Sequence, residues 1–149
     1  MIYIASDHAG FQLKKHLIQY LKVKVIGVED CGAFEEDGED DYPDLIYPCA
    51  KKVVDDKGSF GIVIGGSGQG EAIVANKVKG IRAAIYNGGK PEIAKVAKEH
   101  NNANVLSLGA RFITEDDAKR AVTMWLEAKF EGGRHERRVK KVEKIESKF

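Results

Sequence analysis

The sequence predicts an α/β protein with a three-layer α/β/α Rossmann-like fold, built on a five-stranded parallel sheet with an extra C-terminal helix. Short apolar runs alternate with longer amphipathic stretches, a pattern typical of a parallel sheet with helices on both faces. The third apolar run leads directly into GGSGQGE, a glycine-rich strand-to-helix turn. The length of 149 residues suits one domain with its own core, so we expect a single domain over 1–149.

The strands are expected where apolar runs are short and bounded by turn residues. These runs cover 2–6, 23–28, 60–64, 81–86 and 104–108.

The first helix is expected over about 10–22. Leu13, Leu17 and Leu21 recur at helical spacing and predict the buried side. Lys14 and Lys15 are expected on the opposite, solvent-facing side.

Proline and capping residues mark the start of the later helices. Pro43 precedes the second, Glu71 lies in the first turn of the third, and Pro91 opens the fourth, which runs to His100. Thr114 followed by Asp117 three residues on is a capping pattern for a fifth helix, which buries Trp125 among other residues.

The C-terminal segment, 132–149, is expected to form a helical tail. Gly132 and Gly133 are expected to end the fifth helix, and the apolar stripe after them is narrow. A helix with so little to bury in its own domain commonly packs on a partner chain, which predicts a homodimer or a dimer of dimers.

Composition excludes several classes of function. The formal net charge of +1 gives no overall field for nucleic acid or membranes, although 29–44 is acidic and 134–149 is basic. No apolar run approaches the length of a membrane span, and no signal peptide is evident at the start, so we expect a cytoplasmic protein.

Neither the cysteines nor the histidines form a metal motif. Cys31 and Cys49 are neither a CxxC pair nor near histidine at ligand spacing. The four histidines are dispersed along the chain at 8, 16, 100 and 135. We therefore expect no metal and no cofactor.

Four loops are expected to meet at the carboxyl edge of the sheet, where open parallel sheets bind ligands. The first strand ends in Ser6-Asp7-His8, and the third in the loop from Gly65 to Glu71. The fourth ends in Asn87-Gly88-Gly89, and the fifth in Gly109-Ala110-Arg111.

The glycine-rich loop predicts an anion site smaller than a nucleotide. From Gly66 it reads G-x-G-x-G and lacks the third glycine of the dinucleotide fingerprint. Gly65 and Gly70 have the separation of a triphosphate loop, but Glu71 stands where that loop needs lysine.

Each candidate side chain also has a structural interpretation that the residues alone leave open. Asp7 can cap a helix or, with His8, form an acid–base pair. Glu71 can complement the helix dipole or act as a general base beside oxyanion-binding amides. His100 can interact favourably with the C-terminal end of a helix dipole, and Arg111 can form a surface ion pair or bind phosphate.

Six segments in order resemble ribose-5-phosphate isomerase type B, in the family that includes galactose-6-phosphate isomerase. They are SDHAGF at 6–11, DYPD at 41–44, GGSGQGE with ANK at 65–77, GIRAA at 80–84, EHNNANVLSLGAR at 99–111 and GGRHERR at 132–138. The resemblance covers nearly the whole chain and implies a metal- and nucleotide-independent isomerase of ribose 5-phosphate and ribulose 5-phosphate, with active sites shared between the subunits of a dimer.

The resemblance also implies a role for each site residue. Glu71 is the base that removes the C2 proton, His100 opens the furanose ring, and Ser67 belongs to the catalytic loop. The substrate-binding residues are Asp7, His8 and Tyr42, the enediolate-binding loop of Gly66, Ser67, Gly68, Gln69 and Gly70, the sugar-binding Asn101, and the phosphate-binding Arg111, Arg134 and Arg138.

One departure from the family pattern bears on the base. Many members carry a cysteine base where this chain has Gly65, whereas another branch has glycine there and uses the glutamate that ends the loop. The chain follows the second branch, which favours Glu71.

Three rival functions remain at this stage. A six-carbon sugar 6-phosphate, such as galactose or allose 6-phosphate, would keep every role and change only the room at the phosphate end. A non-catalytic sugar-phosphate-binding regulator is disfavoured by the joint presence of Glu71, His100 and Ser67. A nucleotide-binding module is disfavoured by the glycine spacing.

Overall fold

The computed structural model describes residues 1–149 and confirms the predicted α/β architecture. All five strands are parallel, in the order β2-β1-β3-β5-β4. The strands are β1 (Ile2–Ser6), β2 (Val28–Asp30), β3 (Phe60–Gly65), β4 (Ala83–Tyr86) and β5 (Val105–Gly109). The helices are the short 3-10 helix η1 (His8–Gly10), α1 (Phe11–Val23), α2 (Tyr42–Asp55), α3 (Gln69–Asn76), α4 (Glu92–Asn101), α5 (Glu115–Glu127) and α6 (Arg134–Glu146).

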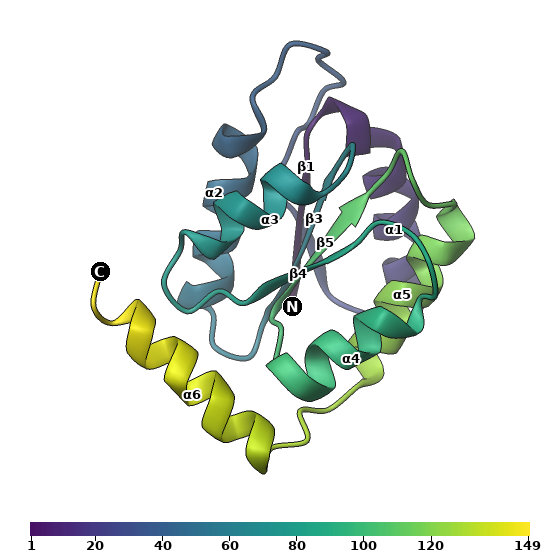
Figure 1. Cartoon of the computed structure of the whole chain (residues 1–149). Helices are drawn as coiled ribbons and strands as arrows, with labels where there is room; N and C mark the ends of the chain where they lie inside the picture. The colour runs from purple at the N-terminus through teal and green to yellow at the C-terminus, as the bar shows by residue number, and fades with distance from the viewer.

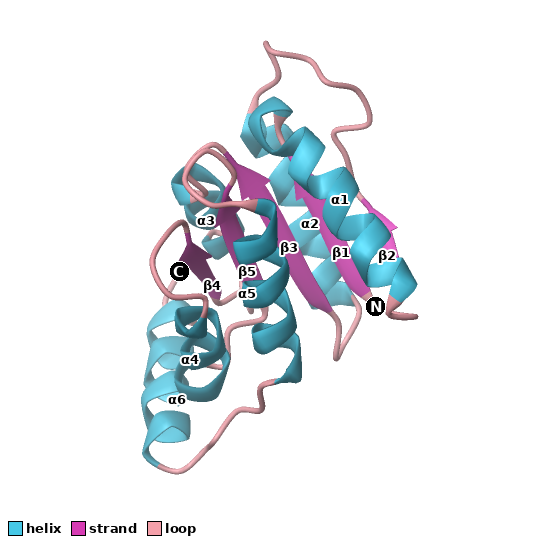
Figure 2. Ribbon diagram, turned by 90° about the vertical axis from the view of Figure 1, so that its right-hand side faces the viewer, coloured by secondary structure: helices cyan, strands magenta, loops and turns pink.

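The sheet separates two hydrophobic cores, which make the three layers visible in Figures 1 and 2. One core joins alternate strand residues such as Ile4 and Ile64 to α1, α4 and α5, with Trp125 fully buried. The other joins residues of the opposite parity, such as Val63, to α2 and α3. Strand side chains alternate between faces, so the apolar runs fill both cores at once.

Parallel register brings the strand ends together at one edge. Ser6 of β1 pairs with Ile64 of β3, and Gly65 at the end of β3 pairs with Gly109 at the end of β5. The loops that follow these strands therefore open on the same side of the sheet, where open parallel sheets bind ligands.

The predicted second strand was placed too early. Residue 23 still belongs to α1, and the helix is closed by the amides of Val25 and Ile26, which donate to the carbonyls of Lys22 and Leu21. The alternating run Val-Lys-Val-Ile looks like a strand, but Val23 and Val25 are exposed and pair with nothing in the sheet. Pairing with β1 begins only at Val28, opposite Ile2.

Lys14 was expected on the solvent side of the first helix and is instead fully buried. Its Nζ donates to Oδ1 of Asp30 at 2.8 Å and to the carbonyl oxygen of Ala33. Position 14 faces the end of β2 rather than solvent. The ammonium group therefore connects α1, through hydrogen bonds, to the start of the acidic segment that leads to α2. A buried lysine is tolerated there because it is paired and hydrogen-bonded.

The fifth helix ends earlier than predicted, at Glu127, with Ala128 as its C-cap. The glycine pair lies beyond it, where Gly133 precedes the first residue of α6. The predicted cap at its other end is confirmed, since the Thr114 hydroxyl accepts a hydrogen bond from the Asp117 amide at 3.1 Å.

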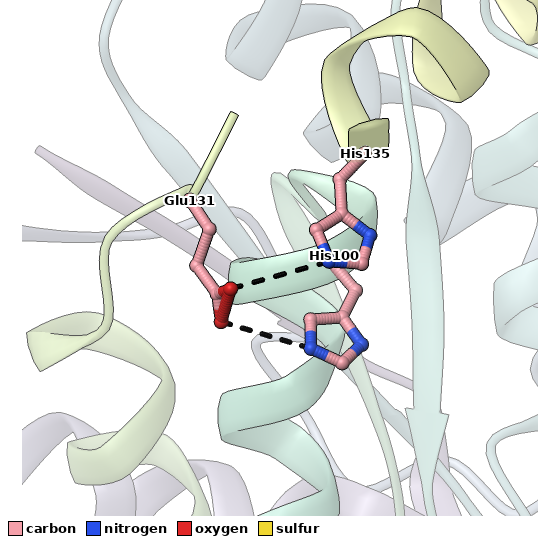
Figure 3. Close-up of side chains that lie close together, drawn as sticks. All are labelled: His100, Glu131 and His135. Atoms are coloured by element: carbon pink, nitrogen blue, oxygen red, sulfur yellow. Dashed lines mark ion pairs between the residues drawn. The ribbon is translucent and has the colours of Figure 1, made fainter. Parts of the chain in front are cut away.

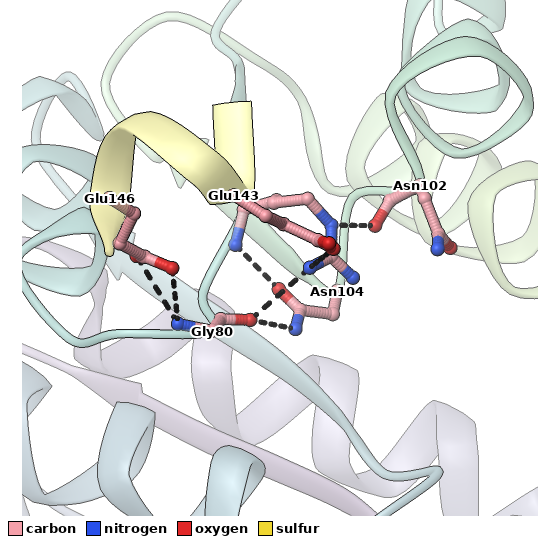
Figure 4. A network of polar contacts seen from close by, with 6 residues as sticks. Gly80, Asn102, Asn104, Glu143 and Glu146 are labelled. Carbon is pink, nitrogen blue, oxygen red and sulfur yellow. Dashed lines mark hydrogen bonds and ion pairs between the residues drawn. The ribbon is translucent and has the colours of Figure 1, made fainter. Parts of the chain in front are cut away.

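Helix α6 lies along the outside of the molecule beside α4 (Figures 1 and 2). Val139 is its one buried residue, whereas Val142 and Ile145 are exposed. Two of its carboxylates contact the turn before β4 (Figure 4). Oε1 of Glu146 accepts a hydrogen bond from the Gly80 amide at 3.2 Å, and Oε1 of Glu143 lies 3.8 Å from Nη1 of Arg82. These polar contacts hold the helix to its own chain, and they leave its apolar stripe uncovered.

Lys98 is a second buried lysine, but it has no carboxylate partner. Its Nζ lies 3.7 Å from the centroid of the Phe60 ring and 4.6 Å from that of Trp125. Burial lowers the pKa of Lys98 from 10.5 to about 8. The unfolded chain therefore binds more protons between pH 8 and 10.5, so the stability contributed by this group rises with pH across that window.

We expect Lys98→Met to raise the free energy of unfolding at pH 7 by about 1–3 kcal/mol, because it removes a buried charge whose cost the aromatic faces offset only in part. The variant should also lose the rise in stability between pH 8 and pH 10. Urea unfolding at pH 7, 9 and 10 measures both effects. If Lys98→Met is less stable than the parent at pH 7, the aromatic rings stabilise the ammonium group by more free energy than its burial costs.

No helix of the chain combines the length and the apolar character needed to span a bilayer. Cys31 and Cys49 are both free thiols.

Candidate active site

The loop from Gly65 to Glu71 forms the centre of the carboxyl edge, and its neighbours hold it in place. Gly68 has a left-handed backbone with φ of 78°, and a Cβ there would lie 2.9 Å from the carbonyl oxygen of Leu108. Only glycine combines that conformation with so close an approach. The Ser107 hydroxyl donates a hydrogen bond to the Gly68 carbonyl at 2.6 Å, and the side-chain amide of Asn87 donates one to the Ser67 carbonyl at 3.0 Å.

Helix α3 starts within this loop at Gln69. The amides of its first turn point beyond the strand ends, and the Ser67 hydroxyl accepts one of them, from Gln69, at 3.2 Å. Backbone amides at a helix N-terminus stabilise a negative charge placed before them. The loop is therefore suited to an oxyanion.

The Glu71 carboxylate points back from α3 to the end of β3. The residue is only 4% exposed, and a Cβ on Gly65 would lie 1.9 Å from its Oε1. The carboxylate thus occupies the space that any side chain at position 65 would need. This explains in physical terms why glycine at 65 accompanies glutamate at 71.

Burial has the largest effect and raises the pKa of Glu71; a hydrogen bond from its own amide lowers this pKa, and the charge and hydrogen bond of Asp7 raise it by lesser amounts. Amides at the start of a helix lower the pKa of a nearby carboxyl group. Burial already outweighs them in the free chain. Glu71 is therefore a stronger base than an exposed glutamate.

Asp7 serves as a helix cap and also faces the site. Its Oδ1 accepts from the amides of Ala9 at 2.9 Å and Gly10 at 3.3 Å, which fixes the start of η1. Its negative charge acts on Glu71 at the same time. The predicted cap is confirmed, whereas the imidazole of His8 pairs with Asp40 rather than with Asp7.

Asp40 is a site residue that the sequence analysis did not single out. Its Oδ1 lies 2.7 Å from His8 Nδ1 and also accepts from the His8 amide at 3.2 Å. The hydrogen bond to Asp40 raises the pKa of His8. The only sequence signal was the acidic segment 29–44, which could not show which of its carboxylates turns inward.

Tyr42 and Arg111 flank the loop on two sides. A Cβ on Gly70 would lie 2.7 Å from Cζ of Tyr42, and a Cβ on Gly66 would lie 3.1 Å from Nη1 of Arg111. These two glycines therefore let the ring and the guanidinium group approach the backbone. The fold brings Asp7, His8, Tyr42, Gly66, Ser67, Gly68, Gln69, Gly70, Glu71 and Arg111 to one edge.

The remaining predicted residues lie at the opposite edge. His100 and Asn101 end α4, just before β5 begins, and Arg134 and Arg138 lie in the first turns of α6. Crossing the sheet along β5 separates the two edges by roughly 15 Å at about 3.3 Å per residue. A single chain does not bring these four residues to Glu71.

His100 has close partners of its own at that edge (Figure 3). Its ring stacks on that of His135 with centroids 4.2 Å apart and planes 9° apart. Burial, followed by the charge of His100, lowers the pKa of His135. Glu131 lies beside the stacked rings, with one carboxylate oxygen 3.7 Å from His100 Nε2 and the other 4.0 Å from His135 Nε2.

The fold and the carboxyl edge define a Rossmann-like α/β protein with an anion-binding loop beside a buried carboxylate. A family model described as Ribose/Galactose Isomerase matches residues 2–142. The chain belongs to that family.

Relatives match over almost their full length. The probable ribose-5-phosphate isomerase B of Mycoplasma genitalium is 44% identical over 146 residues, which cover 97% of this chain and 95% of the relative. Ribose-5-phosphate isomerase B of Mycobacterium leprae is 43% identical over 143 residues, covering 93% and 85%.

A solved structure shows the same fold. The crystal structure of the Mycoplasma genitalium isomerase B with bound ribulose-5-phosphate superimposes with a TM-score of 0.94 at 42% identity. The match covers 99% of this chain and 97% of that chain.

Proposed function

We propose that the protein interconverts D-ribose 5-phosphate and D-ribulose 5-phosphate through an enediolate, with Glu71 as the base. The observation that carries the proposal is the buried Glu71 carboxylate, with its raised pKa, set beside helix-start amides. That pairing suits removal of a proton next to a carbonyl group, because the base and the oxyanion donors act on adjacent atoms. The relatives named as ribose-5-phosphate isomerases support the same reaction.

The reaction needs one group to move a proton between two carbons. Glu71 removes the proton from C2 of the open-chain aldose, and the electron pair moves onto the carbonyl oxygen to give the enediolate. The amides of the Gly66–Gly70 loop stabilise that oxygen. The proton of the C2 hydroxyl passes to the C1 oxygen, and return of the carbon-bound proton from Glu71 to C1 then gives the ketose, with its carbonyl at C2, and regenerates the carboxylate.

The phosphate is held at the other end of the substrate. Arg111 lies on the loop after β5, next to Gly66. Arg134 and Arg138 would complete the phosphate site from a second copy of the chain, together with the ring-opening His100 and the sugar-binding Asn101. Arginine is suited to this role because its guanidinium fork binds phosphate through two parallel hydrogen bonds.

The six-carbon alternative is distinguished by substrate preference. Pure protein incubated with ribose 5-phosphate, allose 6-phosphate and galactose 6-phosphate should form ketose fastest from the five-carbon sugar. Binding without any ketose formation would instead fit the non-catalytic regulator.

The isomerase should work without an added cofactor, because the base and the oxyanion donors belong to the protein. We expect turnover of ribose 5-phosphate to be unchanged after treatment with a chelator and dialysis. Ketose formation before and after chelation measures this. Complete loss of activity, restored by a divalent ion, would contradict a metal-independent mechanism.

We also infer that the active enzyme is a homodimer whose sites are shared between chains. The separation of His100 and the α6 arginines from Glu71 within one chain motivates this inference. Exposed apolar side chains support it: Ile73 and Ile85 line a surface hollow of about 590 Å³ between α3 and β4. That hollow lies beside the catalytic loop rather than over Glu71, so we read it as a surface for the partner chain rather than as the substrate pocket.

Mixing two inactive variants should restore activity if the sites are shared. A dimer of one Glu71→Gln chain and one His100→Asn chain has one site with both changes and one site with neither. Random pairing of equal amounts should give about a quarter of wild-type activity, because about half the dimers are hybrids with one intact site. Activity no greater than the average of the two variants would contradict shared sites.

A further inference from the structure

Three side chains from separate parts of the chain meet where α4 ends and α6 begins (Figure 3). His100 closes α4, Glu131 lies in the connection after α5, and His135 lies in the first turn of α6. Their potential ligand atoms all lie within 4.8 Å of one another. No local metal motif marks this cluster, because the two histidines lie 35 positions apart in the sequence.

The three groups lie close enough to be drawn into a metal-ligand set, although the stacked rings must turn to point both nitrogens at one ion. The two imidazole rings are nearly parallel, and both Nε2 atoms face the same carboxylate, one oxygen each, at 3.7 and 4.0 Å. Zinc bonds of about 2.0–2.1 Å in a tetrahedral site place ligand atoms roughly 3.3 Å apart. Ligand atoms that lie within 4.8 Å of one another therefore need to close by up to about 1.5 Å, with a turn of the rings toward a common point.

The His135 side chain and the backbone of Glu131 are held in place, whereas the side chains of His100 and Glu131 can adjust. The Glu131 amide donates to the Glu99 carbonyl at 3.0 Å, which fastens the connection to α4. The His135 side chain is largely buried, at 12% exposed, whereas those of His100 and Glu131 are 41% and 50% exposed. His100 and Glu131 can therefore rotate around a fixed His135 when an ion enters.

We propose that His100 Nε2, His135 Nε2 and a carboxylate oxygen of Glu131 bind a zinc ion, with the fourth position open to water, and that the bound ion inhibits isomerisation by occupying His100. The proposal that zinc binds here depends only on the positions of the three side chains. The proposal that zinc inhibits isomerisation rests on the proposed function, in which His100 opens the sugar ring.

The ligand set also selects the ion. Two imidazole nitrogens and one carboxylate suit zinc, cobalt, nickel or copper, whereas magnesium and calcium prefer oxygen ligands. The charges of Arg134 and Arg138 act on His135 and oppose a cation, so we expect micromolar binding rather than the much tighter binding of a structural zinc site.

The second group of possible ligands, Asp7, His8 and Asp40, is a weaker candidate. Asp7 already accepts two backbone amides, and Asp40 Oδ1 already holds His8. This group has only one imidazole and belongs to the site at the carboxyl edge.

Titration of the full-length, chelator-treated protein with zinc chloride, followed by calorimetry, tests binding without an activity assay. Glu131→Gln and His135→Gln should each weaken binding at least about tenfold. His16→Gln is the matched control, because His16 also pairs with a carboxylate, Glu115, at 3.2 Å but lacks a second imidazole. It should leave zinc binding unchanged. Cobalt chloride should give the visible absorption of a four-coordinate ion in the parent and lose it in His135→Gln.

Zinc should also inhibit ketose formation in the parent, with recovery on addition of chelator, and should inhibit His135→Gln only at higher concentration. Equal zinc affinity in the parent, Glu131→Gln and His135→Gln would overturn the site. Zinc bound at the site with full turnover would overturn its inhibitory role. Zinc binding in a protein that turns over no sugar phosphate at all would instead sink the proposed function and leave the metal site standing.

Discussion

Glu71→Gln is expected to lower kcat for ribose 5-phosphate by about 10²–10⁴, equivalent to about 3–5 kcal/mol of barrier. Glutamine keeps the length of the side chain and its place in the first turn of α3 but cannot accept the C2 proton. KM should change little, because Arg111 and the loop amides remain. Exchange of the C2 hydrogen with solvent should fall in parallel with turnover.

The control is Glu92→Gln, which removes a carboxylate from the first turn of α4. Glu92 is exposed and lies 3.9 Å from Arg120, so its loss removes a helix-dipole partner and one weak surface ion pair. If Glu71 were merely a dipole partner, the two variants would behave alike. Near-normal turnover and C2 exchange in Glu71→Gln would move the search for the base to Asp7 and His8.

Stability provides a second measurement on the same variant. The folded pKa of Glu71 is raised, so the folded chain holds this proton more tightly than the unfolded chain. Its contribution to stability therefore falls as pH rises through the interval between its ordinary pKa of 4.5 and the raised value. Above that interval Glu71→Gln should unfold at higher denaturant than the parent, which separates a catalytic defect from a folding defect.

Local sequence patterns predicted most of the fold because they report burial directly. The alternation of apolar runs and amphipathic stretches located four of the five strands, and the Thr114 cap located α5. The failures came where local pattern and tertiary position disagree. Residues 23–27 alternate like a strand yet close a helix, and Lys14 is buried because Asp30 and Ala33 lie opposite it.

The site was predictable where it follows strand ends and not where distant segments meet. The parallel order of β1, β3 and β5 brings Asp7, the glycine loop and Arg111 together, and that order follows from the class of fold. The pairing of His8 with Asp40 joins positions 32 apart. Neither that pair nor the stacking of His100 on His135 leaves a local signal, because both depend on how loops and helix ends pack.

The closeness of Gly65 to Glu71 makes a second large effect expected, from Gly65→Ala. The new Cβ would lie 1.9 Å from Oε1 and 2.1 Å from Cδ of Glu71, so the carboxylate must leave its buried position. The backbone of Gly65 is not in the left-handed region, so alanine itself adds no strain there. Turnover should fall by about 10²-fold or more, as when the base is removed, while the protein remains folded. Turnover near that of the parent, with circular dichroism unchanged, would show that Glu71 does not work from this position.

Moving the base to position 65 is the decisive form of the same experiment. Gly65→Cys in a Glu71→Ala background places a thiol where the carboxylate was, because alanine at 71 clears the space that glutamine would still fill. A thiol close to the N-terminus of α3 should have a lowered pKa, and its thiolate can then remove the C2 proton. We expect the double variant to turn over ribose 5-phosphate at least about tenfold faster than Glu71→Ala, since general-base catalysis contributes about 10²–10⁴ in rate. Gly65→Ser in the same background matches the size without the basic thiolate and should recover nothing. Equal recovery by serine and cysteine, or none by cysteine, would mean that the end of β3 does not face C2 of the substrate.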